Sequence, residues 1–179
     1  MKRILNLVLV VVLCLLPVNV FAEGMNGANN EGIDISGKLI KIQNTYTAED
    51  EWFIEDYEGN QHKVLGYLPA MTDAFNSYLG LNIAVSGSYS KDGSSSIIVK
   101  QIDCTRYIGS VEKVLIGKLA YKYDGKTNAF KYSLTSIYDN SKYELKDWNN
   151  VLAPSLAGKT IVVGGSIYPN PYFSVDKTY

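Results

Sequence analysis

The sequence has little of what a catalyst or a metal centre needs. Histidine occurs once, at His62, in a chain of 179 residues. A single histidine excludes a histidine-rich zinc site. The motifs G-x-S-x-G and H-E-x-x-H and the phosphate-binding P-loop are also absent from the sequence. We therefore expect a protein that is not an enzyme, with no catalytic residue, no metal site and no cofactor.

An excess of either charge is lacking as well. Lys and Arg number 17, Asp and Glu number 18, and 46% of the residues are hydrophobic. This is the composition of a globular protein, and it excludes disordered, collagenous and polytopic membrane chains. A nucleic-acid partner is disfavoured, because binding to phosphates needs a basic surface.

Long apolar runs are missing apart from one near the start of the chain. Residues 1–22 begin with Lys2 and Arg3, continue through 13 residues interrupted only by a single Asn, and end on Val20-Phe21-Ala22. A membrane-spanning helix needs roughly 20 apolar residues, whereas this layout is typical of a secretory signal peptide. We expect an exported protein, periplasmic or secreted, with no transmembrane segment after cleavage and a flexible Gly- and Asn-rich leader at 23–32.

Cleavage after Ala22 would remove Cys14 and leave Cys104 as the only cysteine. An intramolecular disulfide would then be impossible, although exported proteins often use them. Cys104 is expected as a small buried side chain in a strand, since free cysteine is among the most buried residue types. The alternative is a disulfide to another chain.

The rest of the sequence is duplicated. Gly37-Lys38-Leu39 recurs as Gly117-Lys118-Leu119, and at the same offset of 80 positions Trp52 matches Tyr132, Asn60 matches Asn140 and Leu65 matches Leu145. Further along, the segment 80–88 matches 158–166 at an offset of 78. We infer two copies of one structural unit, a first domain at 33–107 and a second at 112–179. The short connection 108–110 favours an interface between them.

Each copy is expected to contain five strands, with one short helix between the third and the fourth. The first copy has strand patterns at 38–42, 52–56, 61–65, 81–89 and 97–102, and a helical pattern after Pro69. The second has strand patterns at 117–123, 130–136, 142–145, 160–167 and 173–176, and a helical turn at 151–156. This order predicts an all-β protein of two tandem five-stranded OB-like Greek-key barrels.

The first copy also resembles a family of small exported bacterial OB-fold proteins. The resemblance covers residues 36–103 and rests on Gly-Lys-Leu opening a strand, Asp56-x-x-Gly59-Asn60, Leu81-x-Ile83-x-Val85-x-Gly87 and Asp92-Gly93. The second copy departs from it, with Tyr138-Asp139-Asn140 at the turn and Pro169-Asn170-Pro171 before the last strand. The resemblance implies an envelope protein without catalysis.

OB-fold barrels bind ligands on their second and third strands, so we place the candidate ligand-binding site there. Alternation puts Trp52 and Ile54 inside the barrel and Phe53 and Glu55 outside. The candidate ligand-binding residues are Phe53, Glu55, Tyr57, His62 and Lys63. Phe130 and Tyr132 share the apolar side of their strand with Leu134, and most other aromatic residues, these two included, are expected in the core.

Three functions remain open at this point. The first is a non-catalytic envelope module that binds an oligosaccharide, a cell-wall fragment or a protein. The second is a structural or assembly protein that binds a partner subunit through sheet edges and a tyrosine-rich surface. The third is an enzyme with a site between the barrels, which the sparse set of catalytic side chains disfavours. The acidic residues between Glu49 and Glu58 also allow a site for a hard cation such as calcium, although charge runs are usually solvated.

Overall fold

The computed structural model describes residues 32–107, 110–167 and 172–179. The expected signal peptide and leader up to residue 31, and most of the connection at 108–110, lie outside the described residues. Glu31–Tyr179 forms one compact unit. Over the described residues, the secondary structure is almost entirely strand with a single α-helix, which confirms the all-β prediction. No helix in this part of the chain is long and apolar enough to cross a membrane.

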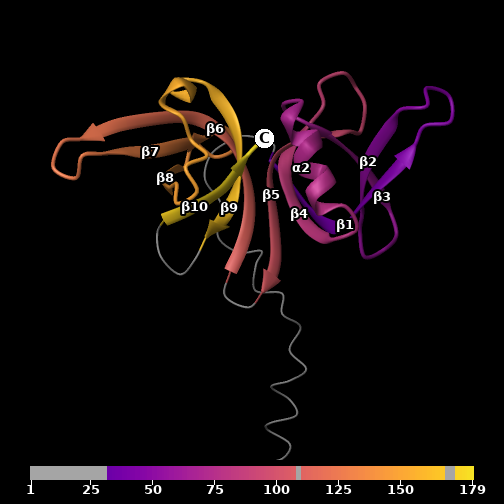
Figure 1. Cartoon of the computed structure of the whole chain (residues 1–179). Helices are drawn as coiled ribbons and strands as arrows, with labels where there is room; N and C mark the ends of the chain where they lie inside the picture. The colour runs from indigo at the N-terminus through magenta and orange to yellow at the C-terminus, as the bar shows by residue number, and fades with distance from the viewer. Residues whose placement is uncertain (1–31, 108–109, 168–171) are drawn as a thin grey trace, which may run out of the picture. The chain divides into compact units, whose positions relative to one another are not determined.

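The described elements follow the expected order twice (Figure 1). The first half contains β1 (Ile33–Gln43), β2 (Asp50–Glu55), β3 (Gln61–Gly66), α2 (Ala70–Tyr78), β4 (Asn82–Tyr89) and β5 (Ile97–Tyr107). The second half contains β6 (Ser110–Asp124), β7 (Ala129–Ser136), β8 (Lys142–Lys146), the 3-10 turn η1 (Pro154–Leu156), β9 (Thr160–Ile167) and β10 (Tyr172–Thr178). The two halves therefore share one order of elements.

Strand pairing repeats in the same way. In the first half β1 pairs with β2 and β4, β2 with β3, β4 with β5, and β3 with β5 in the parallel sense. In the second half β6 pairs with β7 and β9, β7 with β8, β9 with β10, and β8 with β10 in the parallel sense. β5 and β6 pair with each other and stand side by side in Figure 1, so all ten strands form one hydrogen-bonded network.

Glycines fix equivalent points in both halves. Gly80 and Gly158 each have a positive φ, and each donates its N–H over 2.8 Å to a strand carbonyl, Leu39 and Leu119 respectively. Gly87 and Gly165 lie so close to the neighbouring strand that a Cβ would be 2.1 Å and 2.0 Å from a carbonyl oxygen. The offset of 78 is therefore correct for this part of the repeat.

The third strand does not follow the predicted offset of 80. Trp52 pairs with Val64, and its equivalent Tyr132 pairs with Leu145, so Leu145 corresponds to Val64 and the offset is 81. Burial agrees, because Val64 and Leu145 are both buried whereas Leu65 is 36% exposed. The second turn is longer by one residue, and its left-handed residue is Asn140 where the first turn has Gly59. The matches of Leu65 with Leu145 and of Asn60 with Asn140 were therefore wrong.

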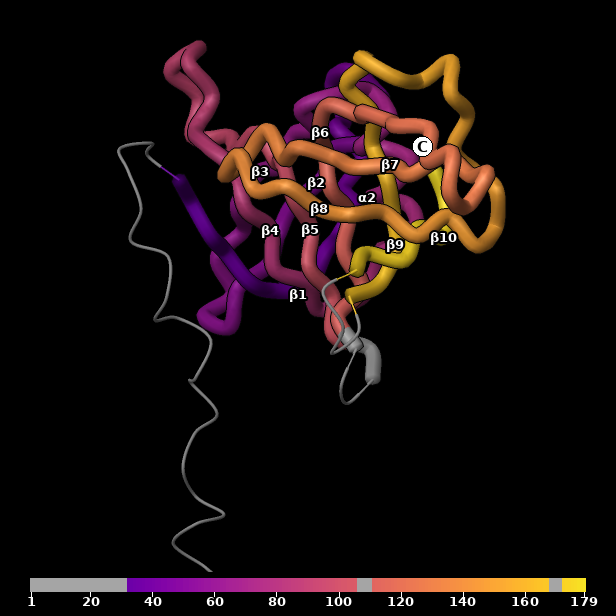
Figure 2. The backbone as a smooth tube through the Cα atoms, turned by 90° about the vertical axis from the view of Figure 1, so that its left-hand side faces the viewer, coloured from indigo at the N-terminus to yellow at the C-terminus, as the bar shows by residue number. Residues whose placement is uncertain are grey.

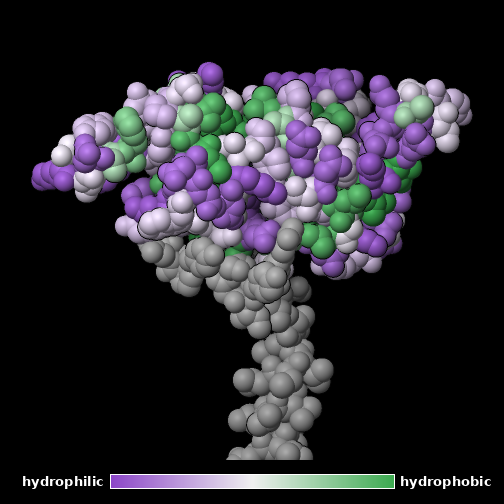
Figure 3. All heavy atoms as spheres, in the orientation of Figure 1, coloured by the Kyte–Doolittle hydropathy of each residue, from purple (hydrophilic) through white to green (hydrophobic). Residues whose placement is uncertain are grey.

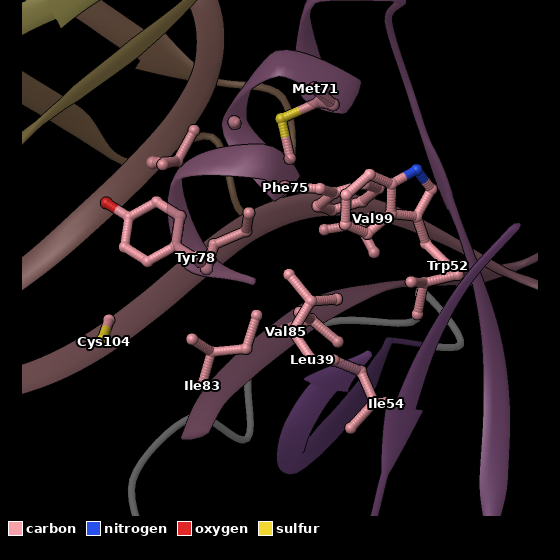
Figure 4. Packing of buried hydrophobic residues seen from close by; sticks show 14 of the residues in the cluster. Leu39, Trp52, Ile54, Met71, Phe75, Tyr78, Ile83, Val85, Val99 and Cys104 are labelled. Carbon is pink, nitrogen blue, oxygen red and sulfur yellow. The ribbon is translucent and has the colours of Figure 1, made fainter. Parts of the chain in front are cut away.

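Two clusters of buried residues form the core. The first lies under α2, where Met71 and Phe75 point toward Trp52 and Val99 (Figure 4), and the ring centroids of Trp52 and Phe75 are 5.5 Å apart. The second cluster fills the other half, around Leu119, Leu134 and Phe173. The first cluster also takes in Val114, Ile116 and Val162 from β6 and β9, so the two halves share buried surface.

The prediction for the cysteine is confirmed, whereas the prediction for the aromatic residues is not. Cys104 is 3% exposed, and its Sγ lies 3.8 Å from the carbonyl oxygen of Asn82, which confirms a small buried side chain in β5. The prediction that most aromatic residues are core was wrong: among the aromatic side chains whose burial is described, five are buried, five are half-buried and eight are exposed. The exposed ones lie in turns, loops and the projecting parts of hairpins, where a high strand propensity does not require burial.

Candidate functional site

The structure brings three of the predicted site residues onto one face of the first half. Phe53 in β2 lies directly opposite Ile40 in β1 and Lys63 in β3, and Glu55 lies on the same face two residues along. Lys63 donates to Glu51 over 2.7 Å, and this hydrogen bond together with one from Asn44 holds the pKa of Glu51 below its usual value. The face is mixed apolar and charged, with Ile40 and Phe53 beside Lys63 and Glu55. Figure 3 shows apolar and polar residues intermixed over the surface of both halves.

His62 does not join that face. It pairs with the buried Ile54, which places it on the opposite side of the β2–β3 ladder from Phe53. Its Nε2 lies 2.9 Å from Oδ2 of Asp56, and the other oxygen of Asp56 accepts from the backbone N–H groups of Glu58 and Asn60. The hydrogen bonds from His62 and Asn60 hold the pKa of Asp56 well below its usual range. His62 therefore secures the β2–β3 turn, where Tyr57 is almost fully exposed.

The acidic residues near β2 do not converge on one point. Asp50 pairs with Lys41 over 2.8 Å, Glu51 with Lys63, and Asp56 with His62. Among the residues described, no group of three or more His, Cys, Asp or Glu side chains is arranged to hold a metal ion. The acids are divided among separate partners, which offers no support for a cation site.

A groove lies on the second half, at the corresponding strands β7 and β8. Its volume is about 440 Å³, and it opens where these strands separate, between the start of β7 and the segment after β8. Phe130, Tyr132 and Leu145 form its apolar wall, and Trp148 forms its rim. We call it the β7–β8 groove. Figure 2 shows β7 and β8 side by side in the view turned by 90°.

The loop after β8 is held in place by one carboxylate. Asp147 accepts hydrogen bonds from the backbone N–H groups of Val151 and Leu152, each over 2.8 Å. The hydroxyl of Tyr132 donates to the carbonyl of Leu152 over 3.3 Å. These bonds fix the loop that carries Trp148, whose side chain is nonetheless 75% exposed. A large aromatic ring is thus presented to solvent from an anchored loop.

The groove continues onto an aromatic hairpin formed by β6 and β7. Tyr123 pairs with Phe130 and Tyr121 with Tyr132, so these rings lie on one side of the ladder. Phe130 packs edge-on against Tyr121 and Tyr123 at centroid distances of 5.3 Å and 5.5 Å, and it is still 46% exposed. The prediction placed Phe130 on the correct side of its strand but in the core, whereas the hairpin carries it beyond the core.

A second hollow, of about 510 Å³, lies on the opposite side of the same ladder. Lys122, Lys131 and Lys142 line it together with Ser133 and Glu144. Lys131 donates to Asp124 over 2.8 Å, which raises the pKa of Lys131 and lowers that of Asp124 to about 2. We call this surface the lysine face.

Neither surface of the second half was predicted from the sequence. Trp148 stands in the polar segment Asp147-Trp148-Asn149-Asn150, where a tryptophan has no strand or helix to pack in, and this was a usable signal. The residues Lys142, Glu144 and Lys146 alternate along β8, which indicates one charged face.

No protein-family model, no curated protein and no solved structure matches this chain. The resemblance to small exported OB-fold proteins therefore stays a prediction. The site defines the protein only by its class, an all-β protein with an open, aromatic-lined surface groove.

Proposed function

We propose that the protein is an exported, non-catalytic binding module of the cell envelope, built from two OB-like barrels, which binds an oligosaccharide or cell-wall fragment in the β7–β8 groove. The pairing order within each half, the helix or helical turn between the third and fourth strands, and the expected signal peptide support this proposal. The groove lies on the second and third strands of its half, where OB-fold barrels bind ligands.

The observation that carries the proposal is the pair of exposed rings at the groove. Trp148 and Phe130 present apolar ring surface beside the polar side chains of Lys131, Glu144 and Asn150. Ring faces stack on the apolar faces of sugars, and neighbouring polar groups bind the hydroxyls. An open groove rather than an enclosed cavity suits an extended chain.

A binding assay with two aromatic variants tests this function. We expect Trp148→Ala and Phe130→Ala each to weaken oligosaccharide binding about fivefold to tenfold, because each removes a ring contact of about 1 kcal/mol. Tyr46→Ala is the control, since Tyr46 is 96% exposed and lies in the β1–β2 loop of the other half. Isothermal titration against soluble cell-wall glycans measures the effect. Equal affinity of the unmodified protein and these three variants would contradict the proposal. Phe53→Ala is measured in parallel, and weaker binding by this variant alone would also contradict it.

The assembly function remains the alternative, and one observation favours it. The aromatic side of the β6–β7 hairpin gathers three exposed rings, Tyr121, Tyr123 and Phe130, and contiguous exposed apolar surface is typical of a protein interface. Sheet edges are a poorer surface for a partner protein, because each strand in the described part of the chain already pairs with at least two others. Assembly predicts a stable oligomer or complex at micromolar concentration. A monomer in light scattering would exclude self-assembly.

A further inference from the structure

Charge is segregated between the two halves, although the whole chain is nearly neutral. Residues 32–107 contain six Lys and Arg and ten Asp and Glu, a net charge of -4. Residues 110–179 contain nine Lys and six Asp and Glu, a net charge of +3. The net charge of the full sequence is therefore small although its second half is basic. The second half is also the one that carries the groove.

The outer side of β6, β7 and β8 concentrates this positive charge. Cross-strand register places Lys118, Thr135 and Lys142 in one row and Lys122 opposite Lys131 in another. Ala120 and Ser133 lie in the row between them, next to Glu144. Since residues two apart in a strand are separated by about 7 Å, lysines surround a floor of Ala120, Ser133 and Glu144, and the charge of Glu144 is paired with Lys146.

Three of these lysines are not neutralised. Within the described residues Lys131 pairs with Asp124 and Lys146 with Glu144, whereas Lys118, Lys122 and Lys142 make no ion pair. Lys122 stands directly opposite Lys131, whose charge is paired with that of Asp124, so Lys122 is the unpaired cation of this row.

We propose that the ligand of this protein is an anionic envelope polymer, whose repeated phosphodiester or carboxylate groups bind Lys118, Lys122, Lys131 and Lys142 on the lysine face. This inference rests on the proposed binding function and specifies its substrate class. The lysine face and the β7–β8 groove share Lys131, Tyr132 and Glu144 in their linings. The two surfaces therefore adjoin at these residues, and a long polymer can place some of its sugar rings in the groove and, further along its chain, acidic groups on the lysines.

A polymer fits the charge distribution better than a single small anion. The four lysines come from three strands and border the floor instead of converging on one point. Lysine ammonium groups on flexible stems act as point charges without the fixed fork geometry of arginine. Such a face suits charges repeated along a chain.

The same geometry favours an acidic glycan over a nucleic acid. Single-stranded nucleic acids are bound by basic side chains and stacking rings on one surface. Tyr121 and Tyr132 line the hollow with the lysines, but alternation directs both rings to the other side of the ladder, where Tyr132 is buried and Tyr121 packs against Phe130. The floor between the lysines instead carries Ser133 and Thr135, whose hydroxyls can donate to anionic oxygens.

Binding of four polymers to the mature chain, residues 23–179, tests the proposal. The probes are poly(glycerol phosphate), polygalacturonate, neutral dextran and oligo-dT. We expect one or both acidic glycan-type polymers to bind, with an affinity that falls as salt rises, because screening weakens exposed charge pairs. The two acidic probes separate a phosphodiester from a carboxylate ligand.

Matched variants identify the surface. Lys118→Ala, Lys122→Ala and Lys142→Ala combined should weaken binding by about tenfold or more, because three exposed cations are lost without breaking an ion pair. The control combines Lys38→Ala, Lys91→Ala and Lys100→Ala in the first half, which changes the net charge equally. We expect the control to bind within twofold of the unmodified chain. Unchanged melting temperatures verify that both variants are folded.

Other outcomes overturn the proposal in distinguishable ways. Equal weakening by both triple variants would mean charge attraction without a site. Binding of a neutral cell-wall glycan alone, sensitive to Trp148→Ala, would keep the proposed function and reject the anionic ligand. Preference for oligo-dT would assign the face to nucleic acid. Absence of binding to every glycan would contradict both the proposed function and this inference.

Discussion

Single glycines set the curvature of the strands. β1 pairs with β4 over Ile33–Lys38 and with β2 over Lys38–Gln43, so it changes partner next to Gly37. A Cβ on Gly37 would be 2.2 Å from the carbonyl oxygen of Glu55, and one on Gly117 would be 2.4 Å from that of Thr135. These contacts explain why Gly-Lys-Leu is repeated in the sequence, since only glycine permits the approach of the two strands.

Substitution of these glycines should be costly. We expect Gly37→Ala and Gly117→Ala each to lower the free energy of unfolding by about 2–3 kcal/mol, because the added methyl group must displace backbone. Gly125→Ala is the control, since a Cβ there meets nothing within 4 Å and its φ is not positive. Urea unfolding followed by circular dichroism measures the difference. Equal stability of the three variants would refute this account of the repeat.

Acid stability at the residue scale depends on Asp56. Hydrogen bonds from His62 and Asn60 depress its pKa in the folded protein. A carboxyl group with a depressed folded pKa stabilises the protein above its unfolded pKa of about 3.9, and this stabilisation is lost as pH falls further. We expect stability to decline below about pH 4, and Asp56→Asn to reduce that decline. Thermal unfolding from pH 2 to pH 7 measures it, and an identical pH profile in the variant would contradict the assignment.

At the scale of elements, the helix is where the two halves differ most. α2 buries Met71, Ala74, Phe75 and Tyr78, whereas η1 is a 3-10 turn of three residues with none buried. The helix therefore closes the core of its half, and the second half relies on Leu152 and strand residues for that purpose. The half that has only the 3-10 turn is also the half with the open groove, which lies beside Leu152.

Truncation of Phe75 in α2 measures how much this side chain contributes to the stability of the first half. We expect Phe75→Ala to lower the free energy of unfolding by about 3–4 kcal/mol, because it leaves a cavity next to Trp52. Asn76→Ala, on the exposed side of the same helix, should change stability by less than about 0.5 kcal/mol. Denaturant unfolding compares them. A small effect of Phe75→Ala would mean that α2 is not part of the core.

The elements could largely be predicted from sequence, because alternation and glycine-rich turns are local signals. Every expected strand is present, although β1, β5 and β6 extend further than expected, since each of these strands is long enough to pair with more than one neighbour. The one-residue shift at β8 was invisible, because the offset of 80 also aligns leucine with leucine. The shift is visible only in the pairing register of β7 with β8.

The candidate site was harder to predict than the fold. Phe53 and Lys63 could be assigned to one face by alternation, but the distinction between Phe53 and His62 required the register of β3 against β2. The exposure of Phe130 depends on how far its hairpin extends beyond the core, which no local pattern encodes. The lysine face combines residues from three strands, so neither its charge nor its shape can be seen in any single segment.

At the scale of the molecule, the two halves depend on each other. Val114, Ile116 and Val162 of the second half are buried in the cluster of the first, and β5 pairs with β6. The hydroxyl of Tyr138 donates to Asp34 over 3.1 Å, a further contact between the halves. The two repeated segments are therefore similar in sequence, but the unit that folds comprises both of them.

This dependence predicts cooperative unfolding. We expect residues 23–179 to unfold in one calorimetric transition, and the isolated segment 31–109 to be markedly less stable, because it exposes surface that the second half buries. Differential scanning calorimetry measures both proteins. Two separate transitions in the full protein, or an isolated half as stable as the whole, would show that the halves are independent domains.

We propose above that ligands bind the second half, on β7 and β8. Backbone amide chemical shifts of ¹⁵N-labelled residues 23–179, followed during titration with poly(glycerol phosphate) and polygalacturonate, locate the bound polymer. We expect shifts concentrated at Lys122, Phe130–Ser133 and Lys142–Asn150, with little change at Phe53–Lys63. Shifts concentrated on β2 and β3, or no shifts with either polymer at millimolar concentration, would contradict it.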